Sequence, residues 1–174
     1  AREKNIFYSK VPAEGTAFPD DQFDLITVAQ ALHWFDRDSF YNEALRVAKP
    51  NAVIAVWGYG LLHIEPAIDK HFMEFYEGTV GAYWDDARRL VEAEYRTISF
   101  PFEEIKAPAF AIKVYWTIDQ LAGYLSSWSA TQKYIKDKLV DPVPTFISEV
   151  EKHWNSREML VQFPIFMKLG IIKK

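Results

Sequence analysis

Cysteine is absent from this chain of 174 residues. Its absence excludes a disulfide scaffold, a thiolate metal site and a cysteine nucleophile, and it fits a cytoplasmic location. Glycine and proline are scarce, with 7 and 9 residues, whereas Phe, Trp and Tyr make up 16% of the chain. This balance excludes a disordered, collagen-like or low-complexity chain. The composition therefore predicts a globular protein with a deep core or a ligand pocket.

Long apolar runs and basic tracts are missing as well. The longest apolar stretch, Val53 to Ile64, contains Gly58, Gly60 and His63 and is shorter than the roughly 20 residues that span a bilayer. The formal net charge is -4, and no basic tract stands out. We therefore expect neither a membrane partner nor a nucleic-acid partner.

The N-terminal third of the chain alternates between predicted strands and a predicted helix. Ile6 to Ser9 is a short candidate strand, and Phe23 to Ala29 is a nearly continuous apolar run with a β-branched centre. Val53 to Trp57 has the same character. Continuous apolar runs are typical of strands that are covered on both faces of a parallel sheet.

A helix is predicted to connect the second and third of these strands. Asp36 can cap its N-terminus, and Phe35 and Phe40 have the spacing of a hydrophobic staple. Pro50 is expected to stop the helix, and Asn51 is a candidate for a left-handed cap. Strand, helix and strand together predict a right-handed β-α-β unit.

The remainder of the chain combines helices with two further strands. Residues 61–97 and 117–157 are predicted to be mainly helical, with one helix from Trp84 to Tyr95 and another that begins at a capping box on Thr117. Residues 110–116 and 163–169 alternate as strands do, and Pro164 favours a strand start or an edge position. We expect one α/β domain over residues 1–174, with parallel strands, a C-terminal antiparallel strand pair and a helical insertion or cap.

Candidate binding residues follow the predicted strands. Ligands in open α/β sheets bind beyond the carboxyl ends of the strands. The segment after Ala29 supplies Gln30, His33 and Trp34, all with polar tips, and the segment after the first short strand supplies Glu14. The Glu14 carboxylate is able to accept a hydrogen bond from an exocyclic amine.

The run from Ala13 to Asp36, followed by Arg46 to Pro50, resembles the class I S-adenosylmethionine-dependent methyltransferases. In particular it is similar to the methyltransferase type 11 group, which includes trans-aconitate methyltransferase-like proteins. Three later runs share the resemblance: Trp116–Leu121, Tyr124–Ala130 and Phe163–Gly170. The resemblance implies a partial Rossmann-like sheet, S-adenosylmethionine as cofactor and methyl transfer to a small molecule. It places Ala13 and Glu14 near the adenine, and these residues along the cofactor or acceptor: Gln30, Ala31, His33 and Trp34.

One part of the family pattern does not occur in this sequence. The glycine-rich loop that receives the methionine part of the cofactor is expected upstream of residue 1. We therefore expect the chain to be the C-terminal part of a methyltransferase fold and to be inactive by itself. A sheet that lacks its first strands exposes an edge, which a homodimer could cover.

The chemistry of the acceptor decides whether a base is needed. A carboxylate acceptor needs none, whereas a hydroxyl or amine acceptor must lose a proton, and His33 is the candidate base. Trp57, Tyr59 and Trp128 are candidates for the apolar walls of the acceptor pocket. In each case a purely structural role is open: His33 at a strand-to-helix corner, and the aromatic rings in the core.

Other functions are weighed against methyl transfer. No His-Glu-x-x-His motif occurs, so we expect no metal site, and no Gly-x-Ser-x-Gly elbow indicates a serine hydrolase. The main alternative is a non-catalytic α/β module that dimerises or binds a protein partner. A different α/β enzyme is the third possibility.

Overall fold

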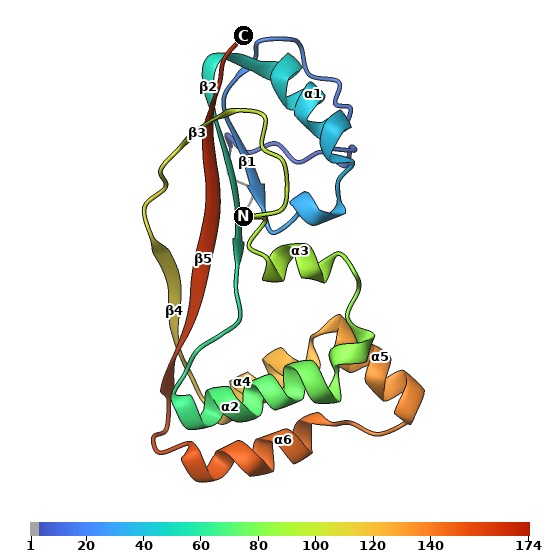
Figure 1. Cartoon of the computed structure of the whole chain (residues 1–174), viewed down its shortest axis with the longest axis vertical. Coiled ribbons are helices and arrows are strands. Elements are labelled where there is room, and N and C mark those ends of the chain that lie inside the picture. Colours follow the sequence, from blue (N-terminus) through green and yellow to red (C-terminus); the bar gives the residue numbers. More distant parts are fainter. Residues whose placement is uncertain (1–3) are drawn as a thin grey trace. The chain divides into compact units, whose positions relative to one another are not determined.

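The computed structural model describes residues 4–174, which belong to two compact units (Figure 1). Unit 1 comprises Ala1–Trp57, Ser99–Ala107 and Met167–Lys174, and unit 2 comprises Gly58–Ile98 and Pro108–Phe166. Both units combine helices and strands, which confirms the α/β fold class. The expectation of a single domain stays a prediction.

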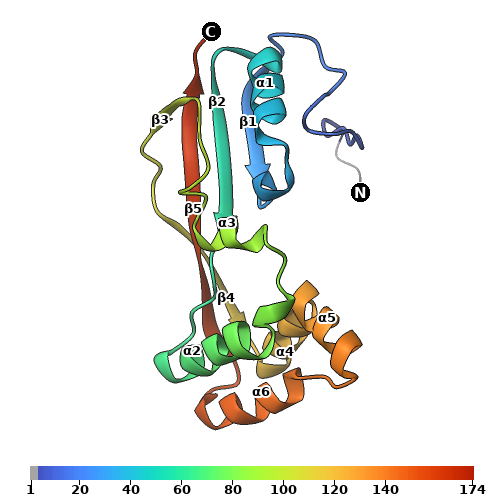
Figure 2. The same ribbon diagram turned by 45° about the vertical axis from the view of Figure 1, so that its right-hand side comes forward.

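Unit 1 contains a sheet with strand order β1-β2-β5-β3. The first pair, β1 (Phe23–Ala29) with β2 (Ala48–Tyr59), is parallel, as predicted. The short β3 (Glu103–Ile105) pairs antiparallel with the C-terminal end of β5 (Met159–Ile172). Helix α1 (Arg37–Val47) is the crossover connection between the parallel strands and lies beside them (Figure 2).

The N-terminus of α1 is determined by its own sequence. The Asp36 side chain accepts a hydrogen bond from the Ser39 N–H at 3.1 Å, and the rings of Phe35 and Phe40 lie 5.0 Å apart. Both the predicted cap and the predicted staple are therefore confirmed. Helical spacing gives the helix one buried side, formed by Phe40, Tyr41, Ala44 and Val47.

The end of α1 differs from the prediction. The helix ends at Val47, and Pro50 lies within β2. Phe23 pairs with Ala48 but Leu25 pairs with Val53, so β2 bulges between these two points. Asn51 has a φ of 64° within this bulge. The left-handed conformation was predicted for it, but at the end of the helix and not inside a strand.

Two expectations for the N-terminal strands are wrong. Ile6 to Ser9 forms no strand, and Phe7 there is 91% exposed, with no neighbouring strand among the described residues to pair with it. Strand β1 is not covered on both faces: Val28 is its one buried residue, and Leu25 is 55% exposed. Among the described residues β1 pairs with β2 alone, so it is an edge strand of the sheet.

Unit 2 is built mainly from the helices that were predicted in residues 61–97 and 117–157. These helices are α2 (Pro66–Met73), α3 (Arg88–Glu92), α4 (Ile118–Ser126), α5 (Ser129–Lys138) and α6 (Val143–Val150). Strand β4 (Phe110–Trp116) pairs antiparallel with β5, which confirms the C-terminal antiparallel pair. The Thr117 capping box is also present.

Two local predictions in unit 2 are wrong. The helix expected from Trp84 to Tyr95 is α-helical only over α3, because Glu94 and Tyr95 adopt positive φ values of 51° and 55°. Pro164 is neither at an edge nor at a strand start: it lies inside β5, and its carbonyl accepts a hydrogen bond from the Gly60 N–H at 2.8 Å.

The core of unit 2 lies among α2, α4 and α6. Its most completely buried large side chains are Leu62, Ile68, Phe72, Val80, Leu121, Leu125, Val150 and Val161. Burial of each large apolar side chain contributes about 1.5–3 kcal/mol, so these helices are held by packing rather than by helix propensity. Within residues 4–174, no helix has the length and apolar character needed to cross a bilayer.

Candidate functional site

The two predicted cofactor segments meet in unit 1. The Asp36 N–H donates a hydrogen bond to Oε1 of Glu14 at 3.1 Å, so the loop before β1 contacts the turn after it. Gln30 begins that turn with a φ of 51°, and its N–H donates to the Trp57 carbonyl at 2.8 Å. We call residues 13–16 and 30–36 the β1 corner.

A buried leucine orients the turn of the β1 corner. Leu32 is fully buried and anchors the short 3-10 helix Leu32–Trp34, while Trp34 is 64% exposed. The His33 ring is half-buried, with its centroid 4.7 Å from that of the Trp34 ring. Ala13 and Ala31 are half-buried in the same two segments. The corner therefore presents an indole supported by an imidazole.

An ionic network fixes the loop of the β1 corner to α1. Oε1 of Glu43 accepts hydrogen bonds from the Thr16 N–H and from Nη2 of Arg46, both at 2.8 Å. Arg46 also pairs with Asp20 at 2.7 Å. Hydrogen bonds from Arg46 and Thr16 lower the pKa of Glu43 to about 2. Glu43 is thus charged at neutral pH and holds the loop in place.

Trp128 lies at the centre of an aromatic cluster in unit 2. Its ring centroid is 5.7 Å from Phe72, 5.2 Å from Trp84 and 5.4 Å from Tyr124. Burial raises the pKa of Tyr124 to about 12, although its hydrogen bond with Trp128 lowers this pKa by a smaller amount. The indole of Trp128 therefore has the surroundings of a residue packed against the core.

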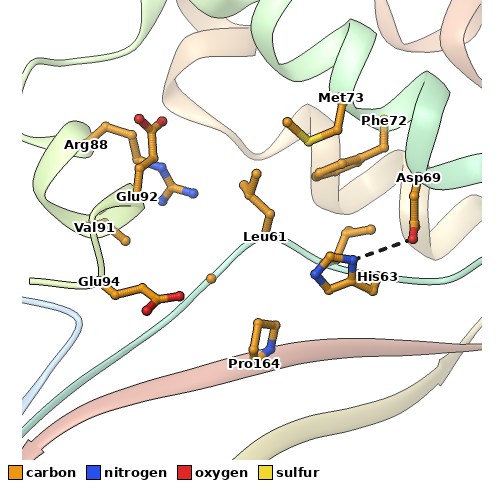
Figure 3. A pocket seen from close by; sticks show the side chains of 12 residues that line it. Leu61, His63, Asp69, Phe72, Met73, Arg88, Val91, Glu92, Glu94 and Pro164 are labelled. Atoms are coloured by element: carbon orange, nitrogen blue, oxygen red, sulfur yellow. Dashed lines mark ion pairs between the residues drawn. The ribbon is translucent and has the colours of Figure 1, made fainter. Parts of the chain in front are cut away.

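A cavity of about 270 Å³ lies elsewhere in unit 2 (Figure 3). His63 and Asp69 line one side of it, with Nδ1 of His63 and Oδ2 of Asp69 3.5 Å apart. Arg88 and Glu92 of α3 lie on the opposite side. Apolar side chains complete the walls: Leu61, Leu62, Phe72, Met73, Val91 and Pro164.

Tyr76 connects the charged side of this cavity to the aromatic cluster. Nε of Arg88 donates to the Tyr76 hydroxyl at 3.0 Å, and that hydroxyl donates to Oε1 of Glu92. Burial, followed by the hydrogen bond to Glu92, raises the pKa of Tyr76 to about 12. The Arg88 guanidinium also lies 5.1 Å from the Trp84 ring centroid, a cation–π distance. Arg88 is thereby held in one orientation.

Trp57 belongs to unit 1, whereas Tyr59 and Trp128 belong to unit 2, and none of these three predicted acceptor residues lines the cavity. Sequence reasoning identified none of His63, Asp69 and Arg88 as members of a site. No short motif identifies this set, because the segment after β2, helix α2 and helix α3 supply its members separately. Within residues 4–174, no group of three or more acidic or histidine side chains could hold a metal ion.

Comparison with known proteins identifies the family. The sequence profile of the methyltransferase domain matches residues 1–56. A Dictyostelium discoideum protein described as a methyltransferase is 32% identical over 174 residues, a match that covers 95% of this chain and 66% of the relative. A solved structure from Anaeromyxobacter dehalogenans, described as a type II methyltransferase, is 36% identical with a TM-score of 0.93. That match covers 99% of this chain and 74% of the other.

These matches define the class of protein: an α/β chain with the fold of a methyltransferase. The chain belongs to the class I S-adenosylmethionine-dependent methyltransferases, of the methyltransferase type 11 group. It spans 66% of the length of the Dictyostelium relative and 74% of the Anaeromyxobacter chain.

The β1 corner has the chemistry to hold the adenine end of the cofactor. Adenine is a flat ring with an exocyclic amine, so it is held by an aromatic face and a hydrogen-bond acceptor. The exposed indole of Trp34 offers the first, and the carboxylate of Glu14 offers the second. The residues present therefore fit this part of S-adenosylmethionine.

Proposed function

We propose that this chain takes part in S-adenosylmethionine-dependent methyl transfer to a small-molecule acceptor. The observation that carries the proposal is the hydrogen bond from the Asp36 N–H to Glu14, because it joins the two segments expected to hold the cofactor. Membership in the methyltransferase family supports the reaction type.

In this proposal the β1 corner binds the adenine end of the cofactor. Trp34 stacks on the ring, Glu14 accepts from its amine, and Ala13, Gln30, Ala31 and His33 complete the wall. The bound cofactor supplies an electrophilic methyl group on a sulfonium. The work of the protein is then to position the acceptor in line with that group and to exclude water. His33 as proton acceptor, and Trp57, Tyr59 and Trp128 as acceptor walls, stay predictions.

We further propose that residues outside this chain hold the methionine end of the cofactor. The support is that the chain spans only part of its relatives' lengths, together with the expected glycine-rich loop. The 174 residues alone then bind the cofactor weakly and transfer no methyl group. A cytoplasmic location and a homodimer across the β1 edge stay predictions.

Calorimetry with S-adenosylhomocysteine tests the proposed function. It is titrated into the 174-residue chain and into a chimera that adds the part of the Anaeromyxobacter relative that this chain does not match. We expect the chimera to bind at least about ten-fold more tightly than the chain alone. No heat from the chimera at millimolar ligand would overturn the proposal. If the chain instead dimerises with increasing concentration and neither form binds, the non-catalytic module is supported.

A pair of aromatic substitutions locates the binding site. Trp34→Ala in the chimera is expected to weaken binding by about ten-fold or more, which corresponds to loss of about 1.4 kcal/mol of stacking. Tyr115→Ala is the matched control, because Tyr115 lies on β4 in unit 2 and is 66% exposed, close to the 64% of Trp34. Equal affinities in both variants would assign Trp34 to a structural role.

A further inference from the structure

Arg88 lines the cavity of about 270 Å³ in unit 2, together with apolar and acidic side chains. We propose that Arg88 binds the carboxylate of a small molecule in this cavity, and that the apolar wall binds the body of the same molecule. The ligand class is then a monocarboxylate with an apolar body. All the residues concerned belong to unit 2, and the proposal does not depend on methyl transfer.

Three contacts hold the Arg88 side chain in place. Its Nε donates a hydrogen bond to the Tyr76 hydroxyl at 3.0 Å. Its guanidinium carbon lies 5.1 Å from the ring centroid of Trp84 and 5.7 Å from that of Tyr76. The Trp84 indole is itself fixed, because its Nε1 donates to the Tyr76 carbonyl at 3.2 Å. A ligand therefore meets a guanidinium that is already ordered, which lowers the entropic cost of binding.

Tyr76, which supports Arg88, lies in the π-helical turn Glu74–Thr79 that follows α2. The Val80 N–H donates to the Phe75 carbonyl at 3.0 Å, five positions back rather than the four of an α-helix. Such turns are rare and occur frequently at functional sites. Tyr76 is also only 4% exposed, so its hydroxyl is a rigid hydrogen-bond acceptor for Arg88.

The two terminal nitrogens of Arg88 face the cavity. In Figure 3 the guanidinium extends from α3 toward Leu61. Tyr76 occupies Nε alone, and no carboxylate within residues 4–174 forms an ion pair with Arg88. Arg88 is half-buried, and a partly desolvated charge is unfavourable unless it meets an opposite charge. A carboxylate that enters the cavity supplies this charge, and its two oxygens match the planar pair of guanidinium nitrogens.

The acidic side chains of the lining have other partners. Glu92 accepts a hydrogen bond from the Tyr76 hydroxyl, and Glu94 accepts one from Arg96 at 2.6 Å. Oδ1 of Asp69 accepts a hydrogen bond from a backbone N–H at 2.8 Å. Their negative charges still surround the cavity, so they repel a dianion such as a phosphate monoester more strongly than a monoanion. The charge balance therefore favours a single carboxylate.

The rest of the wall fits an apolar body. Its apolar side chains are Leu61, Leu62, Phe72, Met73, Val91 and Pro164. Sites for drug-sized ligands have volumes of roughly 300–1,000 Å³, so a cavity of about 270 Å³ accepts a smaller molecule. A single ring on a short chain is a suitable probe.

An adjoining cavity of about 410 Å³ also contacts Arg88 but is a poorer site for this ligand. The two cavities share Leu61, Arg88 and Glu92. The larger one is lined in addition by Glu77, Asp85 and Asp86, which repel an anion. We therefore expect the ligand in the smaller cavity.

NMR of the ¹⁵N-labelled 174-residue chain, without cofactor, tests the ligand class. Phenylacetate, phenethyl alcohol and phenethylamine have one carbon skeleton with a negative, a neutral and a positive end. The indole N–H signal of Trp84, assigned with Trp84→Phe, reports binding because this ring contacts Arg88. We expect phenylacetate to bind at least about ten-fold more tightly than the alcohol, and the amine no more tightly than the alcohol.

Substitutions in α3 test whether Arg88 causes this preference. In Arg88→Gln, the affinity for phenylacetate should fall by about ten-fold or more, to that for phenethyl alcohol. Arg89→Gln is the matched control, because it removes the same charge one position away, from a side chain that is 83% exposed. It should keep the preference. Arg88→Lys keeps the charge but not the planar fork, so its affinity for phenylacetate should lie between the two.

Tyr76→Phe tests Tyr76 as a positioning residue. This variant keeps the ring and removes the hydroxyl that accepts from Nε of Arg88. We expect the affinity for phenylacetate to fall by about three-fold or more while that for phenethyl alcohol is unchanged. A merely structural role of Tyr76 would change both affinities alike.

Several outcomes would overturn the proposal. They are tighter binding of the amine, equal affinities for the three probes, no Trp84 shift with any probe at about 20 mM, and an equal loss in Arg89→Gln. If Arg88→Gln does not fold, an affinity of Arg88→Lys for phenylacetate equal to that of the wild type would overturn it. A chimera that does not bind S-adenosylhomocysteine would overturn the proposed function alone, because this titration contains no cofactor.

Discussion

Replacement of Trp128 by alanine removes the central ring of the aromatic cluster in unit 2. The rings of Phe72 and Tyr124 meet Trp128 edge to face, at 79° and 80°, and the ring of Trp84 is tilted against it by 56°. Truncation leaves a cavity among rings that belong to α2, α4 and the segment before α3, and these rings cannot all move inward together.

The expected loss of stability is large. Truncation of a buried Trp to alanine costs about 3–5 kcal/mol, and each edge-to-face pair adds about 0.5–1.5 kcal/mol beyond its buried area. Trp128 is half-buried, so we expect about 3–4 kcal/mol in total, toward the lower part of that range. This is a large part of the stability of a typical domain.

Urea unfolding followed by far-ultraviolet circular dichroism measures the loss. Circular dichroism is preferred to tryptophan fluorescence because the substitution itself removes a fluorophore. Trp34→Ala is the matched control, since Trp34 is 64% exposed and its loss should change stability by no more than about 0.5 kcal/mol. A loss below about 1 kcal/mol in Trp128→Ala, with an unchanged slope against urea, would refute the reasoning.

Three further predictions concern α1, β5 and α4. Hydrogen bonds from Arg46 and Thr16 hold the pKa of Glu43 at about 2, below the ordinary 4.5, so Glu43 adds stability above pH 4.5 that is lost as the pH falls toward 2. The melting temperature of Glu43→Gln should therefore fall less steeply between pH 4.5 and pH 2 than that of the wild type. Parallel curves of melting temperature against pH would contradict this. In Gly170→Ala the new Cβ would lie 2.8 Å from Cε1 of Phe100. We therefore expect the free energy of unfolding, measured with urea, to fall by about 1–3 kcal/mol. An unchanged urea midpoint would show that the Phe100 ring moves without cost. Thr117→Ala removes the capping box of α4 and should cost about 1 kcal/mol, whereas Thr117→Ser should restore most of it.

Local sequence signals predicted the elements whose causes are local. Asp36 and Thr117 cap their helices through residues three positions away, so a short window contains the whole interaction. The parallel pairing of β1 and β2 followed from an apolar run, a helix and a second apolar run. Alternation predicted the strands at residues 110–116 and 163–169, and the fold class added their antiparallel pairing.

The errors arose where distant segments decide the outcome. Ile6 to Ser9 has strand-like composition but no partner strand among the described residues, and Leu25 lies on a strand that the described elements do not cover on both faces. The end of α1 depends on a bulge in β2, which no helix rule contains. The contact of Glu14 with Asp36 was not predicted as a hydrogen bond, although both segments were expected at one edge of the sheet.

The cavity of unit 2 was the least predictable feature. His63 and Asp69 are six positions apart, and they meet only because a bridge to Gln162 fixes His63 and the Ile64 N–H fixes Asp69. Arg88 reaches the same cavity from α3 through its contacts with Tyr76 and Trp84. No sequence spacing encodes an arrangement of this kind.

The most direct test of the central claim uses the 6 tryptophans of the chain as reporters, since each indole N–H gives its own NMR signal. S-adenosylhomocysteine is titrated into the ¹⁵N-labelled chimera, with Trp34→Phe used to assign the signal of the β1 corner. We predict that the Trp34 signal shifts and saturates while the signal of Trp154, in unit 2, stays in place. An unmoved Trp34 signal at millimolar ligand would contradict the claim that the β1 corner holds the adenine of the cofactor.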